Sequence, residues 1–170
     1  MTLSRLPFFN IIILADNEGE KDGSIAGFHQ QYAVQDLGTL KHYLGIVIDD
    51  RPEDNMVVIQ RQFAVDILER FAHLMPQNCR LQQDGKPRRL VKTPLPSGCK
   101  LSKSDKQQET AAQSEYADKF PYQQVIGAVM YLAVNTRPGL AYSVNYLSRF
   151  NNEPTYHACK ALVHLLCYIA

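Results

Sequence analysis

The first residues that could do chemistry are an adjacent pair of aspartates, Asp49-Asp50. Neighbouring carboxylates can hold the divalent cations that polymerases use for phosphoryl transfer. This pair, however, follows a β-prone segment and stands directly before Arg51 and Pro52, a combination typical of a turn. We therefore predict a solvated loop here rather than a metal site.

Histidines and cysteines gather near the end of the chain, at His157, Cys159, His164 and Cys167. A helix would bring several of them to one side. Zinc sites, however, use four ligands in closely spaced pairs such as C-x₂₋₄-C or H-x₃₋₅-H, and that spacing is missing. We expect these side chains to pack on a helix face, and we predict no metal site.

Basic residues are densest in a proline- and glutamine-rich connector, residues 76–118. Such a run can contact nucleic-acid phosphates without reading sequence, and four residues are the best candidates: Lys86, Arg88, Arg89 and Lys92. The alternative is a solvated, flexible loop. The sequence alone favours the loop, because no aromatic residue on which a base could stack stands among these cations.

Composition sets wider bounds. The chain has 170 residues, 45% of them apolar, which is enough for one domain or a large piece of one. The net charge of +1 gives no global signature of polyanion binding, so contact with nucleic acid would need a local patch.

Four irregularly spaced cysteines favour free thiols in a reducing compartment. Pro7 and Asn10 interrupt the early apolar run, and we expect no signal peptide or membrane span but a soluble cytoplasmic or nuclear protein.

The elements that must position any site are mainly helical. Apolar residues of the segment 120–150 recur at helical spacing on both sides of Asn135-Thr136-Arg137-Pro138. Pro138 cannot continue a helix but can open one, so we predict two helices with a break at Thr136–Arg137. Helical spacing also predicts helices over 60–72, with an Asp66–Arg70 pair, and over 158–169 after Pro154.

The rest of the chain is less regular. We predict a buried strand at 8–15, a weak helix at 18–32, and a hairpin of strands 43–48 and 56–59 around a polar loop, residues 49–55. Pro76 should end the helix before it. The connector should be irregular until a helix begins near 114–119.

Five blocks in the same order resemble the end of the reverse transcriptase domain of copia-type retrotransposon polyproteins. They are Asp36-Leu37-Gly38-x-Leu40-x-x-Tyr43-Leu44-Gly45-Ile46, Gln60-Arg61-x-x-Ala64-x-x-Ile67-Leu68, Thr93-Pro94-Leu95 with Lys100-Leu101-Ser102-Lys103, the helix pair around Asn135-Thr136-Arg137-Pro138, and Ala158…Leu165-x-x-Tyr168. The resemblance implies an α+β fold: the last strand, helix and β-hairpin of a palm, followed by a mainly helical thumb and connection region.

The resemblance also assigns parts. Residues 1–59 would be a palm remnant with a primer-grip-like hairpin, 60–75 the first thumb helix, 76–118 the connector and 119–170 a three-helix segment. The grip, which positions a primer end in the family, would be Lys41, His42, Tyr43, Leu44, Gly45 and Ile46. The partner implied is an RNA/DNA primer–template, and the intact family enzyme uses Mg²⁺.

Departures from the family pattern bear on activity. The family has a Y-V-D-D strand end directly before an apolar run, whereas here Pro7-Phe8-Phe9-Asn10 precedes Ile11. Asn10 stands where an aspartate belongs, and neither it nor Phe9 can balance two Mg²⁺ ions. The fingers and earlier palm are expected upstream of Met1, and the ribonuclease H region beyond Ala170. We predict a non-catalytic fragment without a cofactor of its own. The alternatives are a nucleic-acid-binding module, a helical protein-interaction module, and a decayed product that folds poorly alone.

Overall fold

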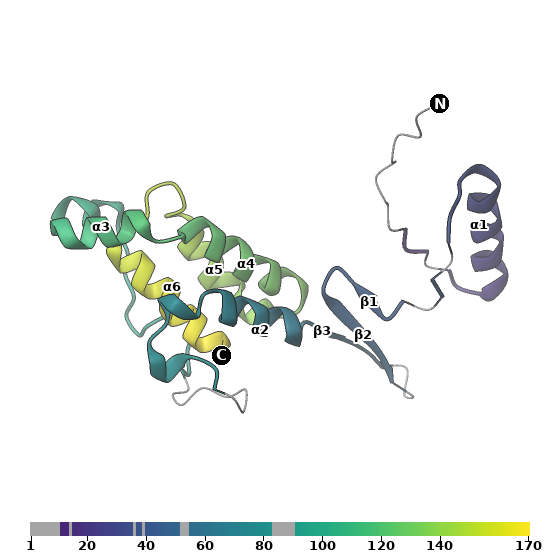
Figure 1. Cartoon of the computed structure of the whole chain (residues 1–170), viewed down its shortest axis with the longest axis horizontal. Helices are drawn as coiled ribbons and strands as arrows, with labels where there is room; N and C mark the ends of the chain where they lie inside the picture. The colour runs from purple at the N-terminus through teal and green to yellow at the C-terminus, as the bar shows by residue number, and fades with distance from the viewer. Residues whose placement is uncertain (1–10, 14, 36, 39, 52–54, 83–90) are drawn as a thin grey trace. The chain divides into compact units, whose positions relative to one another are not determined.

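The computed structural model describes residues 11–13, 15–35, 37–38, 40–51, 55–82 and 91–170 (Figure 1). For residues 49–51 and 55–57 the description covers the backbone alone. Two units follow one another along the chain, Met1–Tyr43 and Leu44–Ala170. Together they hold six α-helices and a small sheet with the strand order β1-β2-β3 within the described ranges, which agrees with the predicted α+β class.

Within its described residues, the N-terminal unit carries one helix, α1 (Glu18–Gln31), at the position predicted. Asn17 caps it, since its side chain accepts a 2.9 Å hydrogen bond from the Glu20 amide. The prediction of a buried strand at 8–15 is wrong for the residues of that range that the structure describes, 11–13 and 15. Residues 11–13 form no strand, and Ile11 and Ile12 are 53% and 40% exposed. A buried strand needs paired neighbours, and the described part of this unit provides only the two-residue β1 (His42–Tyr43). Residues 8–10 and 14 lie outside the described ranges.

The sheet differs from the predicted hairpin at both ends. β2 (Ile46–Arg51) pairs antiparallel with β3 (Asn55–Ile59), with Asp49 opposite Val57 and Asp50 opposite Met56. The predicted loop at 49–55 is therefore too long. The pairing of β2 with β3 continues through both aspartates, because β3 is rich in β-branched residues, which favour strands. The predicted strand 43–48 is interrupted instead. Leu44 and Gly45 form a turn between β1 and β2 with φ of +48° and +77°, the signs of a type I′ hairpin turn.

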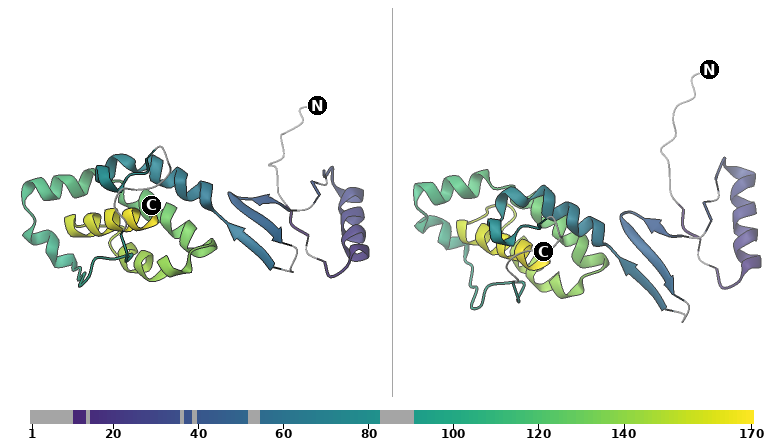
Figure 2. Two further views of the ribbon diagram at one scale, coloured as in Figure 1. Left: turned by 90° about the horizontal axis from the view of Figure 1, so that it is seen from below. Right: turned by 60° about the horizontal axis from the view of Figure 1, so that its bottom comes forward.

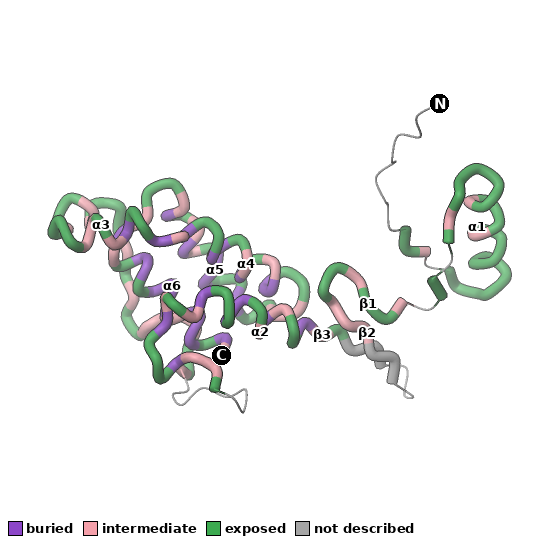
Figure 3. The backbone as a smooth tube through the Cα atoms, viewed as in Figure 1, coloured by how far each residue is buried: buried purple, intermediate pink, exposed green. Residues whose placement is uncertain are grey.

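The core of the C-terminal unit is helical. Four helices contact α6 (Tyr156–Ile169): α2 (Arg61–Arg70), α3 (Ala111–Lys119), α4 (Tyr122–Asn135) and α5 (Ala141–Ser148). Figure 2 gives two further views of this helical part of the chain. Nine residues of α6 are buried, and Figure 3 shows the buried positions on the facing sides of these helices. Full burial of one leucine or valine side chain contributes about 1.5–3 kcal/mol. Several core residues are fully enclosed: Leu132, Leu147, Leu162, Leu165 and Leu166.

The predicted helix pair is confirmed. α4 ends at Asn135 with Thr136 as its cap, and Pro138 opens a short 3₁₀ turn, η4 (Pro138–Leu140), that leads directly into α5. The helices predicted at 60–72 and 158–169 are also present. Asp66, however, accepts a 2.8 Å hydrogen bond from Gln62, one turn before it. α2 ends at Arg70, ahead of Pro76, and a 3₁₀ turn, η1 (Ala72–Leu74), lies between them.

The described parts of the connector, residues 76–82 and 91–118, are more regular than predicted. It contains the 3₁₀ segments η2 (Gln77–Cys79) and η3 (Lys103–Gln108), and α3 begins at Ala111 rather than near 114. Two capping boxes explain the difference. Ser102 with Asp105 and Thr110 with Gln113 satisfy the first amides of η3 and α3 reciprocally. Among the described helices, none combines the length and the apolar character needed to cross a membrane.

Candidate nucleic-acid interface

The turn at Leu44-Gly45 is fixed to the helical core. The Tyr131 hydroxyl, on α4, donates a 2.6 Å hydrogen bond to the carbonyl oxygen of Leu44. The Tyr131 ring packs edge-on against Phe63 of α2, with centroids 5.0 Å apart. A Cβ built on Gly45 would lie 4.0 Å from the Phe63 ring. One aromatic pair from two helices thus holds the start of β2.

Leu44 adopts a conformation that L-residues avoid. Its φ of +48° lies in the left-handed region, although its side chain is 62% exposed and so contributes little packing. Left-handed backbone at a leucine costs roughly 1–2 kcal/mol. Strain of this kind persists only where surrounding contacts over-determine it, and it concentrates at functional sites. The bond from Tyr131 is such a contact.

The other residues predicted to grip a primer lie close by in sequence. Lys41 and His42 are exposed, and Tyr43 is half-buried, at the end of the N-terminal unit. Ile46 is half-buried at the start of β2 in the C-terminal unit.

A polar pair stands near the base of the same helices. Gln60, the residue before α2, is 4% exposed, and its Oε1 accepts a 2.9 Å hydrogen bond from the Thr136 hydroxyl at the end of α4. Its Nε2 is buried and makes no hydrogen bond. The pair ties the end of the sheet to the joint between α4 and α5.

Of the four predicted phosphate contacts, one can be placed. Lys92 is exposed in the connector, while Lys86, Arg88 and Arg89 lie outside the described residues. The next residue, Thr93, accepts a 3.0 Å hydrogen bond from His164 of α6 through its carbonyl oxygen. The connector beside Lys92 is therefore held against α6.

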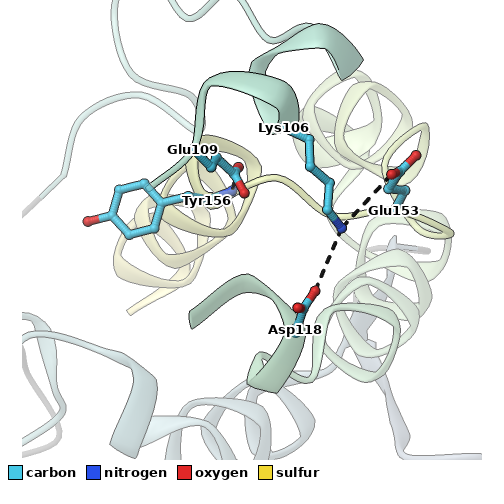
Figure 4. A network of polar contacts seen from close by, with 5 residues as sticks. All are labelled: Lys106, Glu109, Asp118, Glu153 and Tyr156. Carbon is cyan, nitrogen blue, oxygen red and sulfur yellow. Dashed lines mark hydrogen bonds and ion pairs between the residues drawn. The ribbon is translucent and has the colours of Figure 1, made fainter. Parts of the chain in front are cut away.

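A second attachment fixes the other end of the connector (Figure 4). The Lys106 ammonium lies 3.6 Å from the Asp118 carboxylate and 4.0 Å from that of Glu153. Glu109 accepts a hydrogen bond from the Tyr156 amide in the first turn of α6. A carboxylate suits this place because the first amides of a helix have no intrahelical acceptor. The connector from Thr93 to Glu109 is thus bound to the helices rather than free.

A groove lies where this connector crosses α6. It encloses about 560 Å³, and its lining includes the basic side chains of Lys100, His157, Lys160 and His164 with one carboxylate, Asp105. In the sequence, His157 and His164 stand out only as possible zinc ligands, and nothing there connects them with Lys100 or Lys160. The structure brings them together because His157, Lys160 and His164 recur at helical spacing on α6.

α5 contributes aromatic residues beside the connector. The rings of Tyr142 and Tyr146 are nearly parallel, with an angle of 3° and centroids 6.2 Å apart, and Tyr142 is 74% exposed. The Arg149 guanidinium lies 5.9 Å from the Tyr146 ring centre. The Tyr146 hydroxyl accepts a 2.8 Å hydrogen bond from the Leu101 amide. The part of the connector around Leu101 therefore has aromatic neighbours, which α5 supplies.

The described residues contain no group of three or more histidine, cysteine, aspartate or glutamate side chains placed to hold an ion. Asp49 and Asp50 lie in β2 rather than in the predicted loop, and Asn10 is outside the described residues.

Comparison with known proteins finds similarity to products of plant transposons. It is 29% identical, over 141 residues, to the retrovirus-related Pol polyprotein from transposon TNT 1-94 of Nicotiana tabacum. It is similar to retrovirus-related Pol polyproteins of plant transposons. A second match, from transposon RE1 of Arabidopsis thaliana, is 28% identical over 161 residues, or 95% of this chain. These matches support an origin in a retrotransposon polyprotein.

The relatives are mostly much longer. The chain spans about 10% of the length of each of these two polyproteins. It also matches 48% of an uncharacterized mitochondrial protein of Arabidopsis thaliana, with 30% identity over 138 residues. No family model and no solved structure matches. The predicted retrotransposon relationship is confirmed at this level, while the copia type and the reverse transcriptase region stay predictions.

Proposed function

We propose that this chain corresponds to the C-terminal part of a copia-type reverse transcriptase and that it holds a primer–template without catalysing DNA synthesis. The observation that carries the proposal is the strained Leu44-Gly45 turn fixed by Tyr131, because it falls in the block that resembles the family's primer grip. A grip must present main chain to a primer end in a fixed position. A turn held by a side chain from α4 suits that task.

The lack of catalysis rests on the residues ahead of Ile11. Polymerases hold two Mg²⁺ ions through clustered carboxylates, and the family's aspartates are replaced here by Phe9 and Asn10. A phenyl ring offers no ligand, and an amide oxygen carries no charge to balance the ions. The donor set of this chain therefore does not fit the metal pair, and no catalytic step is assigned to it.

Two of the rival functions differ in what they require. A protein-interaction module would present the apolar faces of the last helices to a partner, but most apolar residues of α4 and α6 are buried within the chain, with Met130 and Val134 of α4 exposed. This burial counts against that alternative. A nucleic-acid-binding module without a polymerase ancestry would use the same basic surface, so its test is the choice of substrate.

Two measurements test the proposal. Extension of a primed RNA template with deoxynucleotides and Mg²⁺ should not exceed the no-protein control. Fluorescence anisotropy with a labelled RNA–DNA hybrid should show binding, and the logarithm of the association constant should fall linearly with the logarithm of the salt concentration. Primer extension by the purified chain would refute the lack of catalysis. Absence of hybrid binding at 20 mM salt would refute the role in holding nucleic acid.

A further inference from the structure

The groove between the connector and α6 has an excess of cationic groups. Lys100 and Lys160 are exposed on its two sides, one on the connector and one on α6, and His157 and His164 stand on the same helix face as Lys160. The one acid in the lining, Asp105, is already engaged. Its Oδ2 accepts a 3.0 Å hydrogen bond from the Ser102 amide as part of a capping box. The lining therefore holds two lysines against one aspartate, whose Oδ2 is already hydrogen-bonded.

Two of the basic side chains of the groove, His164 and Lys160, make contacts that restrain them. The Thr93 carbonyl can only accept, so Nε2 of His164 carries the proton in their 3.0 Å hydrogen bond. The Lys160 ammonium lies 4.9 Å from the Tyr116 ring centre and 5.3 Å from that of Tyr156. These cation–π contacts restrain a side chain that is otherwise flexible. A restrained lysine loses less conformational entropy when it binds an anion.

The groove also adjoins the aromatic surface of α5. Leu101, which lines it, donates its amide hydrogen to the Tyr146 hydroxyl, and Tyr146 stacks beside the exposed Tyr142. Surfaces that bind single strands combine a positively charged groove for the backbone with aromatic rings for the bases. Both parts are present here, joined through the Lys100-Leu101 segment.

We infer that this groove binds the backbone phosphates of a nucleic-acid strand, with Lys100 and Lys160 as the principal contacts and His157 and His164 beside them. The inference rests on the proposed nucleic-acid role and names a site for it that is separate from the Leu44-Gly45 turn. Lysine contacts to phosphate supply affinity without sequence preference.

The test compares two double variants of the full chain. K100Q/K160Q removes both groove lysines, and K21Q/K119Q removes two exposed lysines elsewhere, so the net charge changes equally.

Affinity for a labelled 20-nucleotide DNA single strand is measured by anisotropy from 20 to 200 mM salt. The groove variant should bind roughly tenfold more weakly at low salt, and its salt slope should shrink by about 1.4, or about 0.7 per lost phosphate contact. The control should stay within about twofold of wild type. Lys160→Arg keeps the charge and the ring contacts, and should bind like wild type.

A second measurement does not depend on nucleic acid. Inorganic pyrophosphate should shift the imidazole resonances of His157 and His164, but not those of His29 and His73, in an NMR titration. Equal weakening by the two double variants, or no shift of the groove histidines, would overturn the site while leaving the proposed function standing. A wild-type chain that binds neither single strand nor hybrid at 20 mM salt would overturn both.

Discussion

The Tyr131 hydroxyl and the Leu44 carbonyl oxygen form a 2.6 Å hydrogen bond across 87 residues of sequence. The bond joins a strained turn to the middle of α4, whose opposite face lies in the helical core. Because φ of Leu44 is unfavourable, the turn depends on contacts made outside it. This dependence leads to the first two predictions.

Tyr131→Phe should loosen the turn while leaving the helices intact. A single partly exposed hydrogen bond contributes about 0.5–1.5 kcal/mol, and water can replace the lost donor here. We expect the free energy of unfolding in urea to fall by about 0.5–1 kcal/mol and amide exchange at Gly45 and Ile46 to speed up. Tyr168→Phe, which removes a 37% exposed tyrosine's hydroxyl from α6, is the control. Unchanged exchange at Gly45 would contradict the role given to Tyr131.

Two glycine substitutions should change stability in opposite directions. Gly45→Ala places a side chain at φ +77° and near the Phe63 ring, so it should destabilise the fold by about 1 kcal/mol or more. Gly127→Ala, at an exposed position of α4 where a new Cβ meets nothing within 4 Å, should stabilise it by about 0.5–1 kcal/mol. Urea denaturation measures both. Stabilisation by Gly45→Ala would mean that the turn is built differently.

Two threonine caps should differ in their effect on stability. Thr155 is fully buried and accepts a 3.1 Å hydrogen bond from the Ala158 amide at the start of the central helix α6. Thr110 caps α3 in the same way but is exposed. Thr155→Ala should therefore cost about 1–2 kcal/mol and Thr110→Ala about 0.5–1 kcal/mol. Thermal unfolding followed by circular dichroism would detect the difference, and a larger loss at Thr110 would contradict it.

The helical elements could be predicted from sequence because their signals are local. The spacing of apolar residues in α2, α4, α5 and α6 requires only that one face of each helix be buried. Pro138 marks a helix start through its missing amide hydrogen. The capping boxes at Ser102 and Thr110 are equally local, and attention to S-x-x-D and T-x-x-Q would have found η3 and the true start of α3.

The remaining features depend on partners far away in sequence. Asp49 and Asp50 join a strand because β3 pairs with them, although their sequence favours a turn. Leu44 turns with positive φ where a glycine or asparagine would be expected, since Tyr131 holds it. The groove unites Lys100 with Lys160, and no short motif connects them. Tertiary contacts decided each of these cases, so a single sequence could not reveal them.

Alkaline pH should destabilise the fold in part through Cys159. Burial in the core, and next the Glu109 carboxylate, raise the pKa of this thiol from 9.0 to about 12. As pH rises, the unfolded chain therefore loses this proton before the folded chain does. The contribution of the thiol to stability is complete below about pH 9 and is lost progressively toward pH 12.

Cys159→Ala should remove that part of the alkaline loss. Its unfolding free energy should decline less steeply than that of wild type between pH 8.5 and 10.5, measured in urea at each pH. Cys79→Ala, the same change at another buried cysteine, controls for the lost side-chain volume. An identical pH slope for wild type and Cys159→Ala would show that the thiol is not protected in the fold.

Tyr142 should contribute to binding of single strands but not to stability. Its ring is 74% exposed and lies parallel to that of Tyr146, which the Leu101 amide and Arg149 hold in place. Stacking of one base on an aromatic side chain is worth about 1–3 kcal/mol. Tyr142→Ala should therefore weaken binding of a single-stranded oligonucleotide by about tenfold with an unchanged salt slope, since no phosphate contact is lost.

The comparison with other variants separates stacking from a general effect of lost aromatic surface. Tyr32→Ala removes a ring that is 62% exposed in the N-terminal unit, and it should leave binding unchanged. The groove variant K100Q/K160Q should lower the salt slope, whereas Tyr142→Ala should lower affinity at every salt concentration equally. Their effects should add if base and phosphate contacts are independent. A lower slope for Tyr142→Ala, or an equal loss with Tyr32→Ala, would show that no base stacks on α5.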